Sequence, residues 1–299
     1  MLSAYEGEPV VRSAFAEASS VLGYDLWSIV QSGPESRLNS TDCTQPAMLV
    51  AGIALWRLWR ERGGGTPAVV AGHSLGEFSA LVAADALAFP AAVALVELRG
   101  QLMQRAVPAG EGAVAAIIGL TDDEVAAACL EASQGEVVEP ANYNSPAQVV
   151  IAGATAAVQR AIEAAKGRGA KRALLLPVSV PVHSSLMRPA ALQFADALKS
   201  VRIGAPCLDY ISSVDARIYS DPEAIREVLA RQLASPVRWT DTVRALSAYH
   251  IGQIIECGPG KVLTGLNRRS ERRADILVLS LDDLESIDRV RSTTLAAHV

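Results

Sequence analysis

The chain has 299 residues, of which 50% are hydrophobic and 20% are charged, and its formal net charge at pH 7 is −5. This apolar fraction excludes a disordered scaffold, and the negative charge argues against nucleic acid or an anionic membrane as a partner. No apolar run approaches the roughly 18 residues that a membrane helix needs, and the first residues lack the layout of a signal peptide. The four cysteines are widely spaced, which predicts neither a metal site nor a disulfide framework. We expect a soluble, cytoplasmic protein.

Helical periodicity and short apolar runs predict an α/β core that is interrupted by a compact insert. The first part of the core is expected to hold a buried strand at 68–71 and helices at 9–22, 45–62, 77–87 and 90–106. The second part is expected to hold a strand at 253–257 and helices at 186–200, 221–233 and 261–268. Aromatic residues make up only 5% of the chain, which suits helices packed on a buried parallel sheet.

A change of composition at 107–112 marks the start of the insert. Its expected elements are strands at 113–120, 136–141, 148–152 and 173–178, and helices at 122–133 and 155–167. The resulting β-α-β-β-α-β order is that of a ferredoxin-like unit. We therefore predict an α/β-hydrolase-like core with a parallel sheet over residues 1–106 and 178–299, and a ferredoxin-like insert over 107–177.

Residues 72–76 match the G-x-S-x-G motif between a predicted strand and a predicted helix. The two glycines leave room for a tight turn that exposes the Ser74 hydroxyl at a helix N-terminus. There the Leu75 N–H is the natural donor to an oxyanion. A structural glycine turn can show the same pattern, but the strand-turn-helix context favours a nucleophile.

Arg99 lies in the middle of the apolar face of the helix expected at 90–106. Most helical arginines lie on a solvated face, and a guanidinium on an inward face needs a partner because burying it alone is very costly. No carboxylate lies one turn away on that face, so a substrate carboxylate, bound bidentately, is a candidate partner.

Four histidines could supply a base for Ser74. His73 is adjacent to the serine and points differently, His298 lies in the C-terminal tail, and a solvated or structural role is the default for His250. His183 lies in a loop between the last strand of the insert and the next helix, where α/β folds often place catalytic groups. From the residues alone, a structural role for His183 remains equally open.

Several motifs together resemble the malonyl-CoA:acyl carrier protein transacylases. They are TQP at 44–46, GHSLGE at 72–77, VELRG around Arg99, VPVHSSLM at 180–187 and ECGPGKVLTGL at 256–266. The resemblance extends over essentially the whole chain, including the insert, and the combination is far more specific than G-x-S-x-G alone.

The resemblance implies that Ser74 is the acylated nucleophile, that His183 is its general base and that Arg99 binds the malonyl carboxylate. It further implies that the backbone carbonyl of Gln232 orients the histidine in place of a triad aspartate. The remaining implied site residues are Gln45 in the acyl pocket, Leu75 as in malonyl-selective members, and Asn142 and Asn144 on the face of the insert over the cleft.

The implied reaction is ping-pong transfer of malonyl from malonyl-CoA to the phosphopantetheine thiol of acyl carrier protein. It needs no metal or redox cofactor, and we expect a monomer. Because carrier proteins are acidic, Lys171, Arg172 and Arg188 are predicted to form a docking patch, although a merely solvated role for them stays open.

Two other functions remain as alternatives. A serine esterase or thioesterase would use a late histidine with an acidic partner, for which only His250 is available, and would give Arg99 no purpose. A binding module for the carrier protein would have lost catalysis, which the presence of Ser74, Arg99 and His183 argues against.

The sequence departs from the family pattern in two places. Family members open with a strand and a P-G-Q-G-S-Q loop whose glutamine donates a second oxyanion N–H, whereas this sequence opens just past that point. We expect a longer natural chain, and expect that adding such a segment raises the rate by about 10²–10³ and raises thermal stability. Val182 stands where a serine often precedes the histidine, which could alter the pocket slightly.

Overall fold

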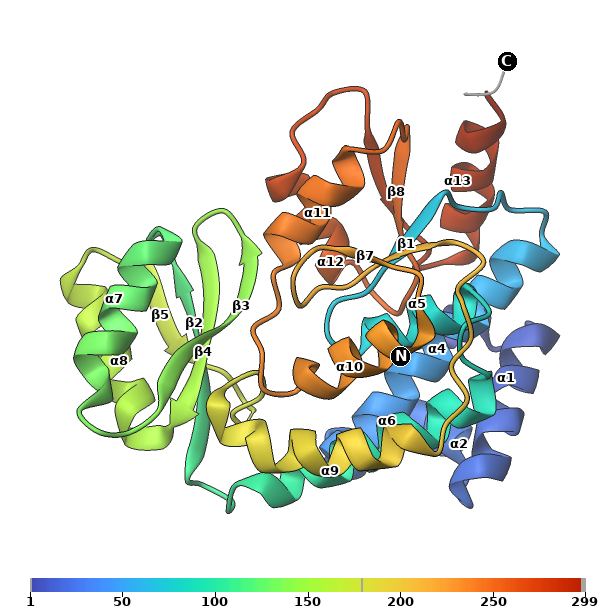
Figure 1. Ribbon diagram of the computed structural model, residues 1–299. Helices are drawn as coiled ribbons and strands as arrows, with labels where there is room; N and C mark the ends of the chain where they lie inside the picture. The colour runs from blue at the N-terminus through green and yellow to red at the C-terminus, as the bar shows by residue number, and fades with distance from the viewer. Residues whose placement is uncertain (1, 179, 297–299) are drawn as a thin grey trace.

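The computed structural model describes residues 2–178 and 180–296, and His298 lies outside them. The N-terminal region is helical (Figure 1): after a short 3-10 turn, Ser3–Tyr5, it holds α1 (Pro9–Leu22), α2 (Leu26–Ser32), α3 (Glu35–Leu38) and α4 (Thr41–Glu61). Helix α1 has Pro9 at its first position, where no N–H is needed, and is followed by Gly23, whose φ of 76° is typical just after a helix.

The strands of the core form two separate sheets in the described residues. In the first sheet, β1 (Val69–Ala71) pairs in parallel with β6 (Asp209–Ile211), which pairs antiparallel with β7 (Ile218–Tyr219). In the second, β8 (Gln253–Glu256) pairs in parallel with β9 (Leu277–Ser280). Val70 of β1 and Ile255 of β8 pack against the same hydrophobic cluster, so both sheets border one core.

Helices surround these strands (Figure 1). They are α5 (Gly76–Ala83), α6 (Phe89–Ala106), α9 (Arg188–Lys199), α10 (Pro222–Gln232), α11 (Trp239–Ser247), α12 (Val262–Ser270) and α13 (Leu284–Ala296). The long helices α4 and α6 pack against each other and supply much of the main cluster, including Leu49, Ile53, Val96 and Met103.

Residues between α6 and α9 form a unit with its own core, on the left in Figure 1. Its elements are β2 (Gly112–Ile118), α7 (Asp122–Ser133), β3 (Val138–Ser145), β4 (Gln148–Ala154), α8 (Thr155–Gly167) and β5 (Arg172–Leu175). The four strands are antiparallel in the order β3-β4-β2-β5, and Val125, Val158 and Ile162 of the two helices pack on the sheet. Strand β3 is therefore one edge of the sheet, and Figure 1 shows this edge toward α11.

Most long elements agree with the sequence prediction, and α1, α7 and α8 have the predicted bounds. The predicted helix at 77–87 is too long, because α5 ends at Ala83: Asp85 takes a φ of 55° and the Ala86 N–H turns back to the Leu81 carbonyl. The predicted strand at 173–178 is also too long, since β5 ends at Leu175. The expected single parallel sheet is likewise divided in two in the described residues.

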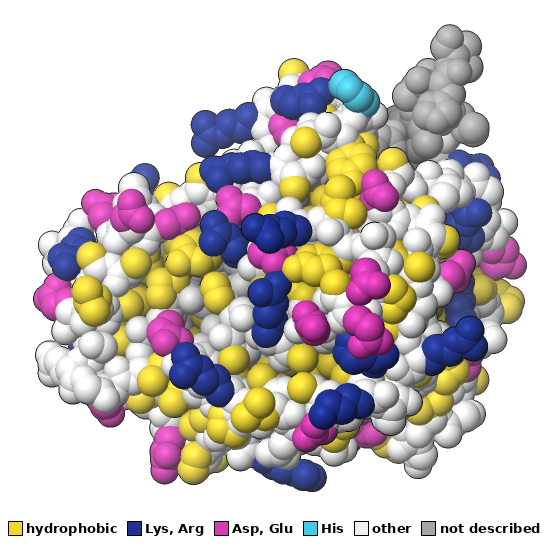
Figure 2. All heavy atoms as spheres, in the orientation of Figure 1, with side chains coloured by type: hydrophobic (Ala, Val, Ile, Leu, Met, Phe, Trp, Pro, Cys, Tyr) yellow, Lys and Arg dark blue, Asp and Glu magenta, His cyan; other side chains and the backbone are white. Residues whose placement is uncertain are grey.

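The described part of the chain contains no helix that is both long and apolar enough to span a membrane. On the face shown in Figure 2, Lys and Arg side chains are interspersed with Asp and Glu side chains, so neither sign of charge dominates it.

Candidate active site

Ser74 lies in the turn between β1 and α5. A Cβ on Gly72 would lie 1.9 Å from the carbonyl carbon of Gly76, so only glycine permits this close turn. Ser74 itself has a φ of 51°, an uncommon value for a residue other than glycine. Its carbonyl accepts a hydrogen bond from the Glu77 N–H at 3.0 Å, whereas the Leu75 N–H donates to no acceptor among the described residues.

The structure brings His183 to Ser74. The Ser74 Oγ lies 2.8 Å from His183 Nε2, and His183 Nδ1 lies 3.1 Å from the carbonyl oxygens of both Gln232 and Ser235. Because carbonyl oxygens can only accept, the proton of a neutral imidazole belongs on Nδ1. Nε2 is then left free to accept the Ser74 hydroxyl proton, which is the arrangement a general base requires.

His183 is held in its neutral form by its surroundings. Its side chain is 3% exposed. Burial, and next the positive charge of Arg99, lower its pKa to about 3. Hydrogen bonds to the Gln232 and Ser235 carbonyls oppose this shift without cancelling it. The imidazole is therefore unprotonated throughout the physiological range of pH.

Arg99 projects from α6 to the same serine. It is 1% exposed, and its guanidinium donates to three neutral acceptors: Gln45 Oε1 at 2.6 Å, Gln232 Oε1 at 3.0 Å and Ser74 Oγ at 3.1 Å. Its Nε has no partner in the described part of the chain. Burial lowers the pKa of Arg99 to about 10, so the side chain stays cationic near neutral pH.

Glu77 is the acidic group whose charge acts on Arg99. It is fully buried in the first turn of α5, and its carboxylate accepts hydrogen bonds from the Tyr210 hydroxyl and from both the N–H and the hydroxyl of Ser213. Burial raises its pKa, and these hydrogen bonds together with one from Gln232 oppose that rise. Glu77 forms no ion pair with Arg99 among the described residues, so the cation lacks a direct counter-charge.

Gln45 reaches Arg99 because α4 and α6 approach closely. Gln45 is 6% exposed, and its Nε2 donates to the sulfur of Met103 at 3.2 Å, which leaves its oxygen for Arg99. Next to Arg99, a Cβ on Gly100 would lie 2.6 Å from the Asp42 Cα, so a glycine is needed where the two helices meet.

The two asparagines of β3 lie at the contact between the insert and the core. Asn144 Oδ1 accepts a hydrogen bond from His73 Nε2 at 2.8 Å, and Asn142 forms an isolated bridge with Val237. His73 therefore contacts the insert rather than Ser74, and its pKa is lowered by burial.

Most of the remaining predicted residues lie at the surface. Lys171 and Arg172 are exposed at the start of β5, the edge of the insert sheet opposite β3, and Arg188 is exposed at the first position of α9. His250 is exposed in the loop between α11 and β8, and the histidine that contacts Ser74 is His183. Leu75 is half-buried and packs against the main cluster.

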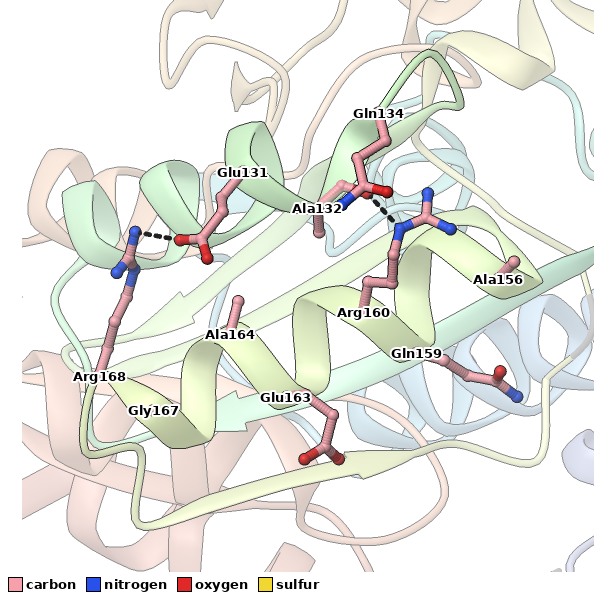
Figure 3. Close-up of a pocket in the computed structure, with 10 residues that line it drawn as sticks. All are labelled: Glu131, Ala132, Gln134, Ala156, Gln159, Arg160, Glu163, Ala164, Gly167 and Arg168. Carbon is pink, nitrogen blue, oxygen red and sulfur yellow. Dashed lines mark hydrogen bonds and ion pairs between the residues drawn. The ribbon is translucent and has the colours of Figure 1, made fainter.

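A shallow hollow of the surface lies between α7 and α8 (Figure 3), away from these groups. Its cations are already engaged, because Arg168 pairs with Glu131 at 2.7 Å and Arg160 donates to the Ala132 carbonyl at 2.8 Å. Within residues 2–178 and 180–296, no group of three His, Cys, Asp or Glu side chains is arranged to hold a metal ion.

Sequence reasoning missed three contributors to the site. Ser235 offers a second carbonyl to His183, Met103 orients Gln45, and the side chain of Gln232 both accepts from Arg99 and donates to the Ser74 carbonyl at 3.1 Å. Met103 and Arg99 are both buried residues of α6, but none of these contacts has a signal in local sequence.

A serine hydroxyl in contact with a neutral histidine and a buried cation is an arrangement suited to acyl transfer, and comparison with known proteins agrees with this type of site. The chain belongs to the acyl transferase domain family, whose model matches residues 4–281. Over 261 residues it is 54% identical to the malonyl CoA-acyl carrier protein transacylase of Salmonella typhimurium, covering 87% of this chain and 84% of that protein. Its identity to the enzyme of the same name from Haemophilus influenzae is 50% over 283 residues, covering 94% and 90%.

Solved structures agree with this relationship. An acyl carrier protein S-malonyltransferase from Vibrio cholerae superposes with a TM-score of 0.93 at 54% identity, over 97% of this chain and 94% of that one. PlMCAT:AntF (holo), a type II PKS acyl-carrier protein in complex with its malonyl-transacylase, gives a TM-score of 0.96 at 50% identity, over 98% and 94%. The family resemblance predicted from the motifs is confirmed.

Proposed function

We propose that this protein transfers a malonyl group from malonyl-CoA to the phosphopantetheine thiol of an acyl carrier protein, through an ester of Ser74. The observation that carries the substrate class is Arg99, a buried cation beside the serine with an unpartnered Nε and no direct carboxylate. A free carboxylate on the acyl group would satisfy it, whereas an uncharged acyl group would not. The names of the relatives, which are malonyl transferases acting with carrier proteins, support the same reaction.

The chemistry follows from the Ser74–His183 contact. Ser74 Oγ attacks the thioester carbonyl while its proton moves to His183 Nε2, and collapse of the tetrahedral intermediate breaks the C–S bond. The departing CoA sulfur takes that proton. The carrier thiol then gives its proton to His183, attacks the ester carbonyl, and Ser74 leaves and is reprotonated. No step changes an oxidation state, and Ser74 and His183 supply the nucleophile and the base, so we propose a reaction without a redox cofactor or a metal.

The remaining groups have supporting roles in this proposal. The free Leu75 N–H stabilises the oxyanion, and the carbonyl of Gln232 keeps the proton of His183 on Nδ1. Gln45 holds the guanidinium of Arg99 in place, at 2.6 Å. Asn142 and Asn144 fix the insert over the cleft through Val237 and His73.

We also propose that the fold consists of an α/β-hydrolase-like core over 1–106 and 178–299 and a ferredoxin-like insert over 107–177. The β3-β4-β2-β5 order and the two helices between its strands support the insert, as does its separate hydrophobic cluster.

The protein is proposed to act as a monomer, with Lys171, Arg172 and Arg188 receiving the carrier protein.

Intact mass spectrometry of the acyl-enzyme tests the function. Malonyl-CoA should add one malonyl group to Ser74, and holo carrier protein should then remove it and carry the added mass. Arg99→Ala should lower acylation by malonyl-CoA roughly 100-fold, because a buried charge pair is lost, but spare or improve acylation by acetyl-CoA. Arg105→Ala, on the exposed face of the same helix, is the matched control.

Three other results would contradict the proposal. Rapid release of free malonate in place of transfer would identify a hydrolase, and no adduct at all would identify a binding module. Equal loss of malonyl and acetyl transfer in Arg99→Ala would make Arg99 structural and remove the basis for a carboxylated substrate.

A further inference from the structure

Strand β3 forms hydrogen bonds with two segments of the chain that lie next to His183. At one end of the strand, the carboxylate of Glu139 accepts hydrogen bonds from the Ser185 N–H at 2.7 Å and from the Ser185 hydroxyl at 2.9 Å. Further along, the Tyr143 N–H donates to the Val237 carbonyl at 2.8 Å and the Val237 N–H donates to the Ala141 carbonyl at 2.9 Å. Strand β3 thus holds two segments that are far apart in the sequence (Figure 1).

These two segments are the ones that position His183. Ser185 is two residues beyond the histidine, and Val237 is two residues beyond Ser235, whose carbonyl accepts from His183 Nδ1. The Leu233 carbonyl accepts from the His183 N–H at 3.0 Å in the same segment. The base therefore lies between two pieces of chain that are both attached to the insert.

The backbone of His183 needs such attachment. Its φ is 65°, in the left-handed region that residues other than glycine rarely adopt, so the conformation persists only where several contacts impose it. The following short 3-10 helix η2 (Ser185–Met187) has no side-chain cap of its own and no acidic residue in its first turn, and α9 has none either. Glu139 supplies from the insert the carboxylate that a helix start favours.

We infer that Glu139 is a positioning residue for His183, one that fixes the histidine loop to the insert by accepting both donors of Ser185. This inference rests on the proposed function only in assigning His183 as the base. Glu139 touches neither substrate nor reacting atoms in this assignment, and it acts through the loop that carries the imidazole.

The test compares Glu139→Ala, Glu139→Gln and Ser185→Ala with Glu124→Ala. Glu124 completes the capping box of α7 with Thr121, so its loss weakens the same insert without touching the histidine loop. The primary readout is the rate at which a small fluorophosphonate labels Ser74, which requires the serine–histidine pair but no CoA and no carrier. Single-turnover acylation by malonyl-CoA is measured alongside, with the apparent Kd for malonyl-CoA.

Glu139→Ala should slow both reactions of Ser74 by about 10- to 100-fold with little change in Kd, because small displacements of a catalytic group cost this much. Ser185→Ala, which keeps the N–H bond, should lose less, and Glu139→Gln, which keeps one acceptor oxygen, should recover part of the rate. Glu124→Ala should lower the melting temperature and leave both rates within about 2-fold.

The pH dependence of the labelling rate is a further readout. A loss of stability alone would not change it. The charged and titratable groups acting on His183 are Arg99 from α6 and His73 from the turn before α5. The acid limb is the fall in labelling rate at low pH, where His183 becomes protonated. If Glu139→Ala loosens the loop and water enters, the pKa of His183 rises and the acid limb should move to higher pH. It should stay unchanged in Glu124→Ala.

Equal labelling rates and equal acid limbs in Glu139→Ala and Glu124→Ala would overturn the inference. Failure of the proposed function is distinguishable from this result: wild-type protein would then be labelled at Ser74 by the fluorophosphonate but not acylated by malonyl-CoA. The effect of Glu139 on labelling would still decide its positioning role.

Discussion

Ser74 and His183 share an uncommon backbone conformation, with φ values of 51° and 65°. Each such residue costs roughly 1–3 kcal/mol, and the surrounding hydrogen bonds have to offset that cost. Ser74 is held by the turn that Gly72 permits and by the side chain of Gln232, which donates to its carbonyl. Strain therefore coincides with the two residues between which the proposed chemistry moves a proton, 2.8 Å apart.

Arg99 carries a comparable cost, that of burying a charge. A buried guanidinium loses its hydration, and three neutral acceptors restore only part of it. The carboxylate of Glu77 helps to keep Arg99 protonated, but the Nε of Arg99 stays without a partner among the described residues. In the proposed function, a substrate carboxylate completes the contacts of Arg99, and acyl groups are discriminated by the penalty for leaving Arg99 unpaired.

The lowered pKa of His183 predicts how acylation depends on pH. Because a general base must be neutral and the pKa of His183 is held at about 3, the base should stay competent well below the ordinary histidine value of roughly 6.5. We expect single-turnover acylation of Ser74 to be nearly independent of pH from about 8 to about 5.

A malonyl thioester of N-acetylcysteamine suits this measurement, since it lacks the titrating phosphates of CoA. Quenched samples are analysed for malonyl-Ser74 by mass. A fall in rate with a midpoint near 6.5 would show that the imidazole is hydrated in solution and that burial does not set its pKa.

At the scale of elements, the contact between α4 and α6 places Gln45 against Arg99. Gly100 makes this contact possible, because a Cβ there would lie 2.6 Å from the Asp42 Cα and 2.7 Å from the Thr41 carbonyl oxygen. Both are backbone atoms, so they cannot move aside as the end of a flexible side chain could. The spacing of two helices thus determines the 2.6 Å contact between Arg99 and Gln45.

Gly100→Ala should therefore lower both stability and malonyl transfer. Overpacking costs about 1–3 kcal/mol, and because the clashing atoms are backbone we expect the upper part of this range, above the roughly 1 kcal/mol that alanine gains over glycine within a helix. Urea unfolding and acylation by malonyl-CoA measure the two effects. Gly265→Ala in α12 is the control, because the nearest atom to its new Cβ is Arg269 Nη2 at 3.8 Å. A Gly100→Ala protein as stable as wild type would show that α6 moves away from α4 without cost.

The sequence predicts elements best where periodicity and end signals agree. Helix α1 has Pro9 at its start and Gly23 after its end, and α7 has the capping box of Thr121 and Glu124. Short elements such as α3, β6 and β7 were not predicted, because four residues or fewer carry no periodicity. The early end of α5 depends on the turn at Asp85, which the apolar run through Leu87 conceals.

The same distinction holds for the site: local motifs predicted some of its residues, whereas its tertiary contacts left no signal in the local sequence. Ser74 was predicted from a strand-turn-helix motif, and the inward position of Arg99 from its helix face. The carbonyls that hold His183 and the carboxylate of Glu139 lie about fifty residues from it in the sequence, so only the family resemblance pointed to Gln232 and nothing pointed to Glu139.

At the scale of the whole molecule, we expect charge to govern the approach of the carrier protein that the proposed function requires. The net charge of −5 repels an acidic partner, so docking needs a local group of cations. Lys171, Arg172 and Arg188 are exposed and form no ion pair among the described residues. Elsewhere, Lys261 pairs with Asp282 at 2.8 Å and Arg268 donates to the Val278 carbonyl, so those two cations are less available.

Charge reversal at the exposed positions tests the docking patch. Lys171→Glu with Arg172→Glu should raise the apparent KM for the carrier protein roughly 10-fold at low salt and flatten its salt dependence, as should Arg188→Glu to a smaller extent. Acylation of Ser74 by malonyl-CoA should stay nearly unchanged, because the carrier takes no part in that half-reaction. Steady-state transfer at several salt concentrations gives both quantities.

The control for net charge is Lys199→Glu with Arg202→Glu, which makes the same change in charge at exposed positions at and just beyond the C-terminal end of α9, where Lys199 pairs with Asp196 at 2.8 Å. If this pair raises the KM as much as Lys171→Glu with Arg172→Glu does, the carrier responds to overall charge and the patch has no special role. If none of the variants changes the KM at low salt, the carrier docks elsewhere. Charge reversal at Lys261 and Arg268 would then be the next test. A selective effect at 171, 172 and 188 would place the approach of the carrier on the side of the insert and the start of α9, where the chain also carries His183.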